Sequence, residues 1–165
     1  MPYRLDTDTQ VFFYEDEFYC LSNFSPFRLY WRGLDFDTSE HAYHWEKFVH
    51  TSQLAPTHIT CDRCDLQQQI LRARSAHAAF KLAESHAIPK QPQWDNHRVA
   101  VMRHILLAKE QQHEYVRRKL LETGTRELIE NSWRDSFWGW GEDGTGQNMM
   151  GKLWMEIRAE LQAAA

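Results

Sequence analysis

The sequence lacks any long apolar stretch. No run approaches the roughly 20 apolar residues that a membrane-spanning helix needs, and residues 1–8 lack the apolar core of a signal peptide. The three cysteines, Cys20, Cys61 and Cys64, are an odd set rather than the paired framework of a secreted disulfide-rich protein. These absences argue against a membrane or secreted protein, and they predict a cytoplasmic one.

Long basic segments are also missing. The formal net charge is −4, and the small basic cluster Arg117–Lys119 does not extend into a block. A protein that grips many backbone phosphates usually shows a basic face, so a small-molecule or nucleotide substrate is favoured over a long nucleic acid. What is abundant is aromatic residues, with seven Trp, six Tyr and nine Phe. Such side chains build a thick core or line a pocket that stacks a base.

The organisation of the chain indicates one domain over residues 1–165. Hydrophobic residues make up 42% and charged residues 25%, which is a globular composition, and neither a repeat nor a linker is visible. We expect a mostly α fold with a small β element near the N-terminus. The β-prone segments are 11–14, 27–31 and 34–36, the last two joined by an Arg32–Gly33 turn, and 22–26 has turn chemistry.

Capping residues and apolar spacing predict the helices. Four longer helices are expected at about 40–50, 65–85, 95–124 and from 149 onward. Their expected caps are Thr38 or Ser39, Asp65, Asp95 or Asn96, and Asn148. A loop is expected at 53–60, a break at 88–93 and a brief return to helix at 126–131.

The helix that begins near Glu40 has two distinct faces. At about 100° per residue, Glu40, Tyr43, His44 and Lys47 share one side, opposite an apolar one. Within a pocket, Glu40 is suited to act as a general acid or base, and Lys47 to offset charge or attack a carbonyl. The alternative is an ordinary solvated polar face.

The glycine-rich loop 139–146 precedes the last helix. It satisfies the letters of a dinucleotide-binding fingerprint, but it follows no buried strand and the chain has no βαβ alternation, so a Rossmann site is rejected. Glycines still let a backbone approach a ligand, and a helix that starts after Asn148 can receive an anion or a sugar. The alternative is a tight structural loop.

Two further residues are candidates for a functional site. Asp135 lies between Trp133 and Trp138, a partly desolvated environment that suits a carboxylate to proton transfer, and with Glu40 it supplies the two carboxylates that glycoside hydrolysis commonly uses. Its alternative role is to cap a turn. Trp94 is a candidate stacking platform, or else a core aromatic.

The segment Cys61–Cys64 hints weakly at a metal site with His50 and His58. One C-x-x-C pair without a second, and a His spacing that matches no standard zinc pattern, favour cysteines without a role. A thiolate stabilised at a helix N-terminus is the other alternative for Cys64. We expect neither a metal nor a cofactor.

Three blocks of the sequence resemble the YbiA-like, or NADAR, family. They are Leu21–Phe24; Thr38–Tyr43 with Lys47 and Phe48; and Asp135–Gly139 followed by Gly144, Gly146, Asn148, Gly151 and 155–158. Trp94, Asp95, Met102 and Lys109 match further positions, and coverage runs from about residue 12 to 161. The chain departs from the family pattern at two places. Residues 79–84 lack the Gly and the Arg of the family's Ala-Lys-x-x-Gly-Arg element, and the family's Lys-Phe pair is replaced by Lys109–Glu110. Both departures affect the expected substrate more than the expected reaction.

The resemblance implies a compact α-rich fold and N-glycosidase activity without a cofactor. Family members hydrolyse the C1′–N bond of ribosylamino-pyrimidine phosphates of riboflavin synthesis, or remove ADP-ribose from guanine, including guanine in nucleic acid. The alternative is a non-catalytic module that binds NAD, ADP-ribose or another nucleotide. No oligomeric state is predicted.

The resemblance also implies roles by position. Glu40 is the main catalytic carboxylate, Asp135 assists it, and Lys47 contacts the sugar or phosphate or traps the opened ribose as a Schiff base. The substrate-binding residues are expected to be Ser22, Asn23, Phe24, Tyr43, Trp94, Trp138, Gly139 and Asn148. We expect the catalytic and binding residues to converge on one pocket.

Overall fold

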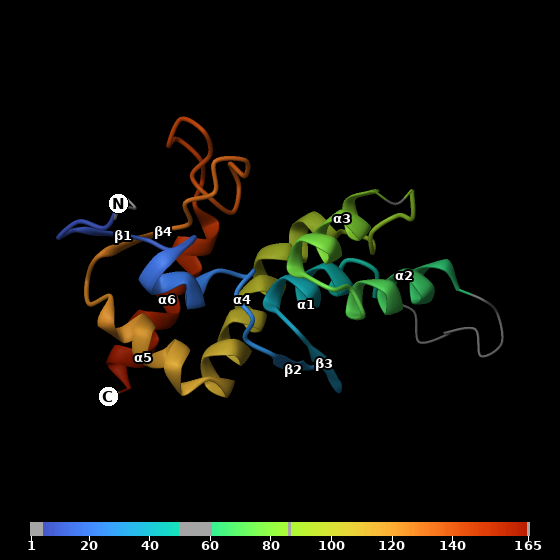
Figure 1. The fold of residues 1–165 in the computed structure, drawn as a ribbon, viewed down its shortest axis with the longest axis horizontal. Coiled ribbons are helices and arrows are strands. Elements are labelled where there is room, and N and C mark those ends of the chain that lie inside the picture. Colours follow the sequence, from blue (N-terminus) through green and yellow to red (C-terminus); the bar gives the residue numbers. More distant parts are fainter. Residues whose placement is uncertain (1–4, 50–60, 86, 165) are drawn as a thin grey trace. The chain divides into compact units, whose positions relative to one another are not determined.

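The computed structural model describes residues 5–49, 61–85 and 87–164, and these are mostly helical with a few short strands (Figure 1). This confirms the predicted fold class. The contacts divide the chain into two compact units, unit 1 with residues 1–25 and 109–165, and unit 2 with residues 26–108. None of the described helices is long and apolar enough to cross a bilayer. The expectation of a single domain over 1–165 stays a prediction.

Unit 2 begins with a hairpin. Strands β2 (Leu29–Trp31) and β3 (Leu34–Phe36) pair antiparallel, with Leu29 opposite Phe36, as predicted. Gly33 takes a φ of 82° in the turn, where glycine has no steric cost. The buried Glu46 accepts hydrogen bonds from the indole of Trp31 at 2.5 Å and from Arg32, so the hairpin is tied to the helix that follows it.

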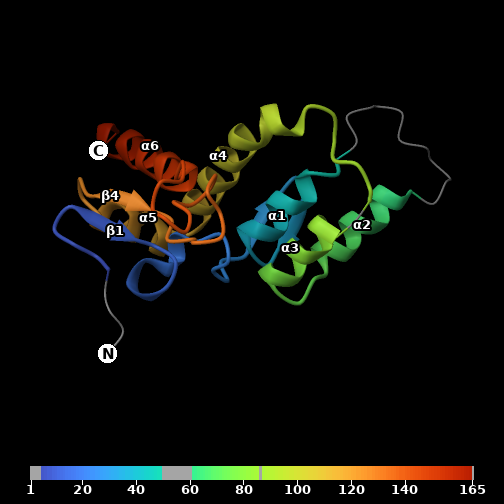
Figure 2. The same ribbon diagram turned by 90° about the horizontal axis from the view of Figure 1, so that it is seen from above.

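Three helices form the core of unit 2. They are α1 (Ser39–Glu46), α2 (Asp62–Leu71) and α3 (Ala76–Ser85), and α1 and α3 lie side by side in Figures 1 and 2. Thr38 caps α1 by accepting a hydrogen bond from the backbone N–H of His41. The buried apolar side chains between these helices are Phe48, Leu66, Ile70, Ala73, Ala79 and Ala83. A small-residue face on α3 lets it approach its neighbours closely.

Two predicted helices in this region are corrected. The first helix ends at Glu46 rather than near His50. The segment 65–85 is two helices, because the chain turns after Leu71, and the Ser75 hydroxyl then accepts the N–H of Ala78 at 3.1 Å. The α2 cap is Cys61 rather than Asp65, since the Cys61 sulfur accepts the N–H of Cys64. The loop expected at 53–60 lies outside the described residues.

Helix α4 (Trp94–Gln112) contains the boundary between the units, and it is shorter than predicted. The helical signal was expected to continue to about Gly124. Instead the extended φ of −132° at His113 interrupts it, and α5 (Glu114–Glu122) starts anew. The break follows from backbone geometry at one residue, which carries no Gly or Pro signal.

Unit 1 joins segments from both ends of the chain. Strand β1 (Gln10–Phe12) pairs in parallel with β4 (Glu127–Ile129), with Val11 opposite Leu128, and α6 (Met149–Ala163) packs against β4 (Figure 2). The short helix predicted at 126–131 is therefore wrong, because strand pairing overrides its local preference. A 3₁₀ helix, η1 (Asp16–Leu21), was not predicted. The indole of Trp154 donates to the Leu21 carbonyl at 2.8 Å and joins η1 to α6.

Candidate functional site

The polar side of α1 is buried. Glu40 is 8% exposed, Tyr43 5%, Lys47 5% and His44 2%. The alternative of a solvated polar face is therefore wrong. Burying ionisable groups is costly unless they are paired or hydrogen-bonded, so the partners of these side chains decide what they can do.

Glu40 pairs with His44. The Glu40 Oε1 lies 2.7 Å from the His44 Nε2, and no described group forms a hydrogen bond with the buried His44 Nδ1. The tautomer that carries hydrogen on Nε2 satisfies this pair, because its N–H donates to the carboxylate. The sequence predicted that His44 shares the helix face of Glu40, but it indicated no role for His44. The i, i+4 spacing from Glu40 was the available signal.

Lys47 pairs with a residue that sequence reasoning did not select. Its Nζ donates to the Glu84 Oε1 at 2.6 Å and lies 5.2 Å from the centre of the Tyr43 ring. Burial lowers the pKa of Lys47, against the opposing effect of the Glu84 carboxylate. A buried lysine with a lowered pKa has a larger neutral fraction, and the neutral amine is the nucleophile.

Trp94 is a core aromatic in the structure. It is 3% exposed, and its ring centre lies 5.3 Å from that of Tyr43 at an interplanar angle of 53°. The pair contributes packing between α4 and α1. The roles of Tyr43 and Trp94 in binding stay predictions.

In unit 1, Asp135 organises a turn. Its Oδ1 accepts the backbone N–H of Phe137 at 2.8 Å and of Trp138 at 2.7 Å, so the turn-capping alternative describes the structure. The rings of Trp138 and Phe137 pack in a T-shaped arrangement, with their centres 4.9 Å apart. A capped turn and a role in catalysis are compatible, since a carboxylate has acceptor capacity beyond one oxygen.

Asn148 occupies the predicted N-cap position of α6, but its side chain makes no capping bond. Its Oδ1 accepts the N–H of Glu130 at 3.0 Å, and its Nδ2 donates to the Leu128 carbonyl at 2.8 Å. The expected side-chain cap is therefore corrected: the amide holds the end of β4 instead. A Cβ on Gly139 would lie 2.8 Å from the Ser132 Cβ and 2.9 Å from the Glu130 carbonyl, so this position has no room for a side chain.

The Ser22–Phe24 segment is supported by a buried lysine. The Lys109 Nζ donates to the Ser22 carbonyl at 2.9 Å and to the Ser25 hydroxyl at 2.8 Å. Burial lowers the pKa of Lys109 to about 7. The Ser22 hydroxyl accepts the N–H of Phe24 at 3.3 Å, and Asn23 is buried. The resemblance had marked Lys109 without assigning it a role.

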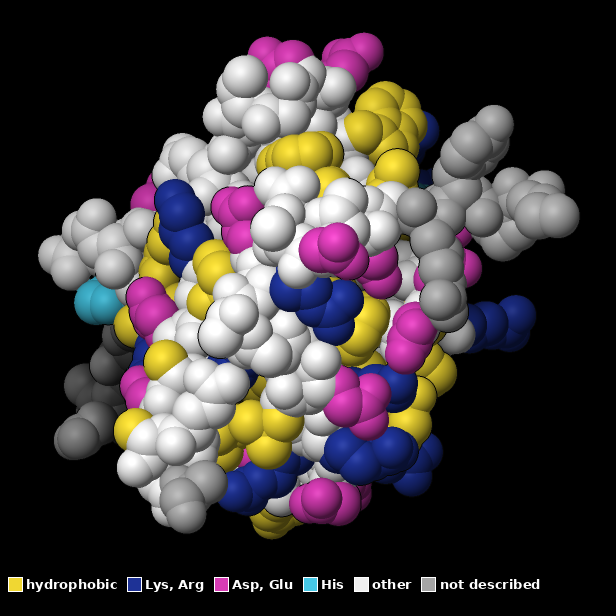
Figure 3. Space-filling model, turned by 90° about the vertical axis from the view of Figure 1, so that its left-hand side faces the viewer, with side chains coloured by type: hydrophobic (Ala, Val, Ile, Leu, Met, Phe, Trp, Pro, Cys, Tyr) yellow, Lys and Arg dark blue, Asp and Glu magenta, His cyan; other side chains and the backbone are white. Residues whose placement is uncertain are grey.

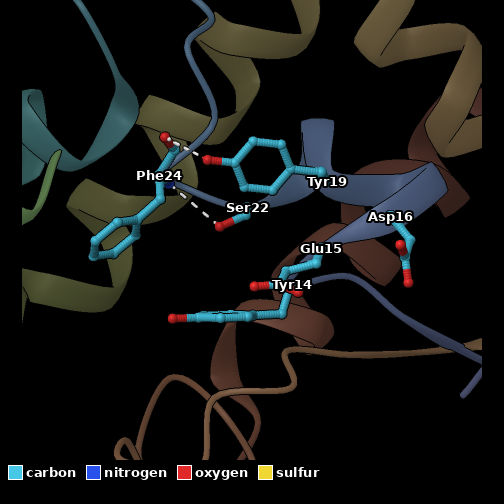
Figure 4. A pocket seen from close by; sticks show the side chains of 6 residues that line it. All are labelled: Tyr14, Glu15, Asp16, Tyr19, Ser22 and Phe24. Carbon is cyan, nitrogen blue, oxygen red and sulfur yellow. Dashed lines mark hydrogen bonds between the residues drawn. The ribbon is translucent and has the colours of Figure 1, made fainter. Parts of the chain in front are cut away.

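A pocket of about 310 Å³ lies in unit 1 (Figure 4). Its lining residues are Tyr14, Glu15, Asp16, Tyr19, Ser22 and Phe24. The Tyr19 hydroxyl donates to the Phe24 carbonyl at 3.0 Å, which fixes one wall. The pocket thus includes two of the three residues of the Ser22–Phe24 segment.

The basic cluster noted in the sequence is neutralised by carboxylates. Arg117 lies 3.6 Å from Glu110, Arg118 lies 3.2 Å from Glu122, and Lys119 contacts Glu17 at 3.1 Å and Glu122 at 2.7 Å; all six residues belong to unit 1. Figure 3 shows acidic and basic side chains intermixed on the face it presents. Because each cation lies next to a carboxylate, the cluster carries less free positive charge for a phosphate than its sequence indicates.

The cysteine segment gives no sign of special chemistry. The hydrogen bond with Cys61, and then burial, raise the pKa of Cys64, so the stabilised thiolate is wrong. Within the described part of the chain, no group of three or more His, Cys, Asp and Glu side chains could hold a metal ion. His50 and His58 lie outside the described residues.

Comparisons with known proteins place the chain in a family. The NADAR domain model matches residues 12–162. The chain belongs to the NADAR family. It is 31% identical to the N-glycosidase YbiA of Escherichia coli over 93% of this chain and 89% of that protein, and 32% identical to an N-glycosidase of Nostoc punctiforme over 92% of each.

Two further comparisons bear on fold and substrate. The NMR structure of Escherichia coli YbiA matches with a TM-score of 0.79 and 30% identity, over 97% of this chain and 89% of that one. A riboflavin biosynthesis protein of Vibrio vulnificus is 38% identical over 94% of this chain, but the chain spans only 39% of that protein's length. With relatives that match almost end to end, this member of the family is an N-glycosidase.

The predicted site residues fall into two groups. Glu40, Tyr43, Lys47 and Trp94 lie in unit 2, and the others lie in unit 1. The contacts described above hold within each unit. The convergence of the two groups of residues on one pocket stays a prediction.

Proposed function

We propose that this N-glycosidase hydrolyses the C1′–N bond of a ribosylated, nucleotide-like substrate, with Glu40 as the main catalytic carboxylate. The observation that carries the proposal is the buried Glu40–His44 pair on α1, next to a buried lysine on the same helix face. Buried, paired ionisable groups are concentrated at functional sites, which supports a catalytic role for this pair.

The chemistry of the bond explains what such a carboxylate does. As the C1′–N bond breaks, the ribose develops oxocarbenium character, and a nearby negative charge stabilises it. Water then adds at C1′ and releases a proton, while the departing nitrogen gains one. Glu40 provides the charge and handles a proton, and its hydrogen bond from His44 holds the carboxylate in place through Oε1.

Lys47 and Asp135 take supporting roles in this proposal. The lowered pKa of Lys47 supports attack of its neutral amine on the aldehyde of the opened ribose, with loss of water to form a Schiff base. Asp135, held by its turn, assists as the second carboxylate. The remaining predicted residues bind the substrate.

Two substrate classes follow from the relatives and the family. The name of the Vibrio vulnificus relative points to riboflavin biosynthesis, and hence to a ribosylamino-pyrimidine phosphate. The resemblance adds ADP-ribosylated guanine, free or in nucleic acid. The paired state of the Arg117–Lys119 cluster supports a small molecule rather than a long nucleic acid.

The test is a parallel incubation of the full chain with ADP-ribosyl-guanosine and with a ribosylamino-pyrimidine phosphate. Mass spectrometry would show guanosine and ADP-ribose from the first compound, or an aminopyrimidine and ribose phosphate from the second. Borohydride added during turnover would trap a Schiff base on Lys47 and add the mass of the ribosyl fragment. Binding of both compounds with cleavage of neither would instead support the non-catalytic module.

A further inference from the structure

The pocket in unit 1 has a chemical character of its own. Three of its six lining residues are aromatic, two are carboxylates, and none is Lys, Arg or His. Its volume of about 310 Å³ is at the small end of the usual range for ligand sites, about 300–1,000 Å³. A phosphate would meet negative charge here, whereas a flat heterocycle with hydrogen-bond donors would meet both stacking surface and acceptors.

Glu15 is the carboxylate placed to act within the pocket. Figure 4 shows the Glu15 side chain beside Tyr14, whereas Asp16 stands apart from the other labelled side chains. Glu15 occupies the N-cap position of η1, but its side chain makes no capping hydrogen bond. The Glu15 carboxylate is therefore not used to cap the helix. Burial, followed by the charges of Tyr14 and Glu15, raises the pKa of Tyr19, which agrees with Glu15 lying near that wall.

The walls around Glu15 are fixed by hydrogen bonds. The Tyr19 hydroxyl donates to the Phe24 carbonyl, and the Phe24 N–H donates to the Ser22 hydroxyl. The Ser22 carbonyl in turn accepts a hydrogen bond from the buried Lys109. A wall held at three successive points changes little on binding, and such preorganisation lowers the entropic cost of association. Tyr14 is 37% exposed, so part of its side chain is accessible to a ligand.

We propose that this pocket binds a flat heterocyclic base, and that Glu15 accepts hydrogen bonds from a ring N–H and a neighbouring amino group while Tyr14 stacks on the ring. An ionised carboxylate accepts two parallel N–H donors, and such charge-assisted pairs are the strong ones. Guanine and 2-aminopyrimidin-4-one rings both present this donor pair, whereas adenine does not. The choice of ligand rests on the proposed function; the character of the pocket does not.

The experiment compares guanosine with inosine, which lacks the 2-amino group, by calorimetric titration of the full chain. We expect the parent to bind guanosine about tenfold more tightly than inosine, the value of one charge-assisted hydrogen bond. Glu15→Gln should abolish that preference. Asp16→Asn is the matched control and should keep it, because Asn tolerates the φ of 60° at this position.

Stacking is tested separately. Tyr14→Leu should weaken both nucleosides by a similar factor, whereas Tyr14→Phe should bind like the parent, because every base has a face to stack. Equal affinity of the parent for guanosine and inosine, or a Glu15→Gln protein that keeps the preference, would overturn the proposal. Failure of the proposed function appears elsewhere, as a parent that cleaves neither ribosylated substrate, and it leaves these affinity ratios unchanged.

Discussion

The predicted site residues of the two units use their polar side chains in different ways. In unit 2, Glu40 pairs with His44 and Lys47 with Glu84, so ionisable groups satisfy one another. In unit 1, Asp135 and Asn148 bind backbone N–H and carbonyl groups and hold loops in place. Side chains that pair with each other keep protons and charge available for chemistry, whereas those bound to the backbone mainly fix geometry. Substitutions at Glu40 and His44 should therefore affect mainly turnover, whereas those at Asp135 and Asn148 should also affect stability.

The largest effect is expected for Glu40→Gln. Gln keeps the shape and the helix propensity but removes the charge, so kcat should fall by about a hundred- to ten-thousand-fold, while product affinity and melting temperature change little. Glu114→Gln, an exposed residue of α5, is the control and should behave like the parent. Turnover of Glu40→Gln at the parental rate would remove Glu40 from the mechanism.

The next effect concerns His44. If its task is to donate a hydrogen bond to Glu40, His44→Leu should lower kcat by about tenfold or more, the value of a hydrogen bond to a charged group. His44→Gln should recover most of this, because its amide N–H reaches a position similar to Nε2.

One result would contradict the positioning role of His44. A His44→Gln protein as slow as His44→Leu would mean that the imidazole itself transfers protons, contrary to the positioning role. His97→Leu, at an exposed site on α4, controls for the loss of a histidine.

A smaller effect is expected at Lys109, and it depends on pH. The folded protein holds the pKa of Lys109 at about 7, below the ordinary lysine value in the unfolded chain. Between these values the unfolded chain binds more protons, so stability should rise with pH by at most about 1.4 kcal/mol per unit from this group. The Lys109→Met protein has no titrating group at this position, so its stability should lack this rise with pH.

Denaturant unfolding of both proteins across this pH range measures the difference. The stability of the parent relative to Lys109→Met should increase as the pH rises above about 7. A difference that is constant with pH would show that Lys109 does not change its protonation on folding.

The smallest structural effect is expected for Asp135→Asn. The amide oxygen of Asn can replace Oδ1 as the acceptor for both backbone N–H groups, so unfolding free energy should change by less than about 1 kcal/mol. Asp135→Ala loses the turn and should cost more. If Asp135 assists catalysis, Asp135→Asn should lower kcat at unchanged stability, by less than Glu40→Gln does. If the Asp135→Asn enzyme keeps the parental kcat, Asp135 has no catalytic role and only caps the turn.

Local signals predicted the elements whose causes are local. The β2–β3 hairpin, the Thr38 cap and the helical character of α1 follow from neighbouring residues. The strand at 127–129 was missed, because its partner β1 lies more than a hundred residues away in sequence. The burial of the polar face of α1 was also beyond the local pattern, since it depends on the packing of other helices around α1.

The candidate site shows the same division. Residue types and spacing pointed to Glu40 and Lys47, but their partners differ in origin. His44 lies one turn from Glu40 and was within reach of a helical wheel, whereas Glu84 pairs with Lys47 only through the packing of α3 on α1. The backbone-bound state of Asn148 likewise depends on β4.

The parallel pairing of β1 with β4 sets an order for folding during synthesis. Residues 26–108 form one continuous unit, and they leave the ribosome before the segment that β1 needs. Residues 10–12 must then wait for residues 127–129, and such distant pairings are slow because a large loop must close first. Until that moment an early strand with unpaired backbone groups is exposed, which is when a nascent chain most needs protection from aggregation.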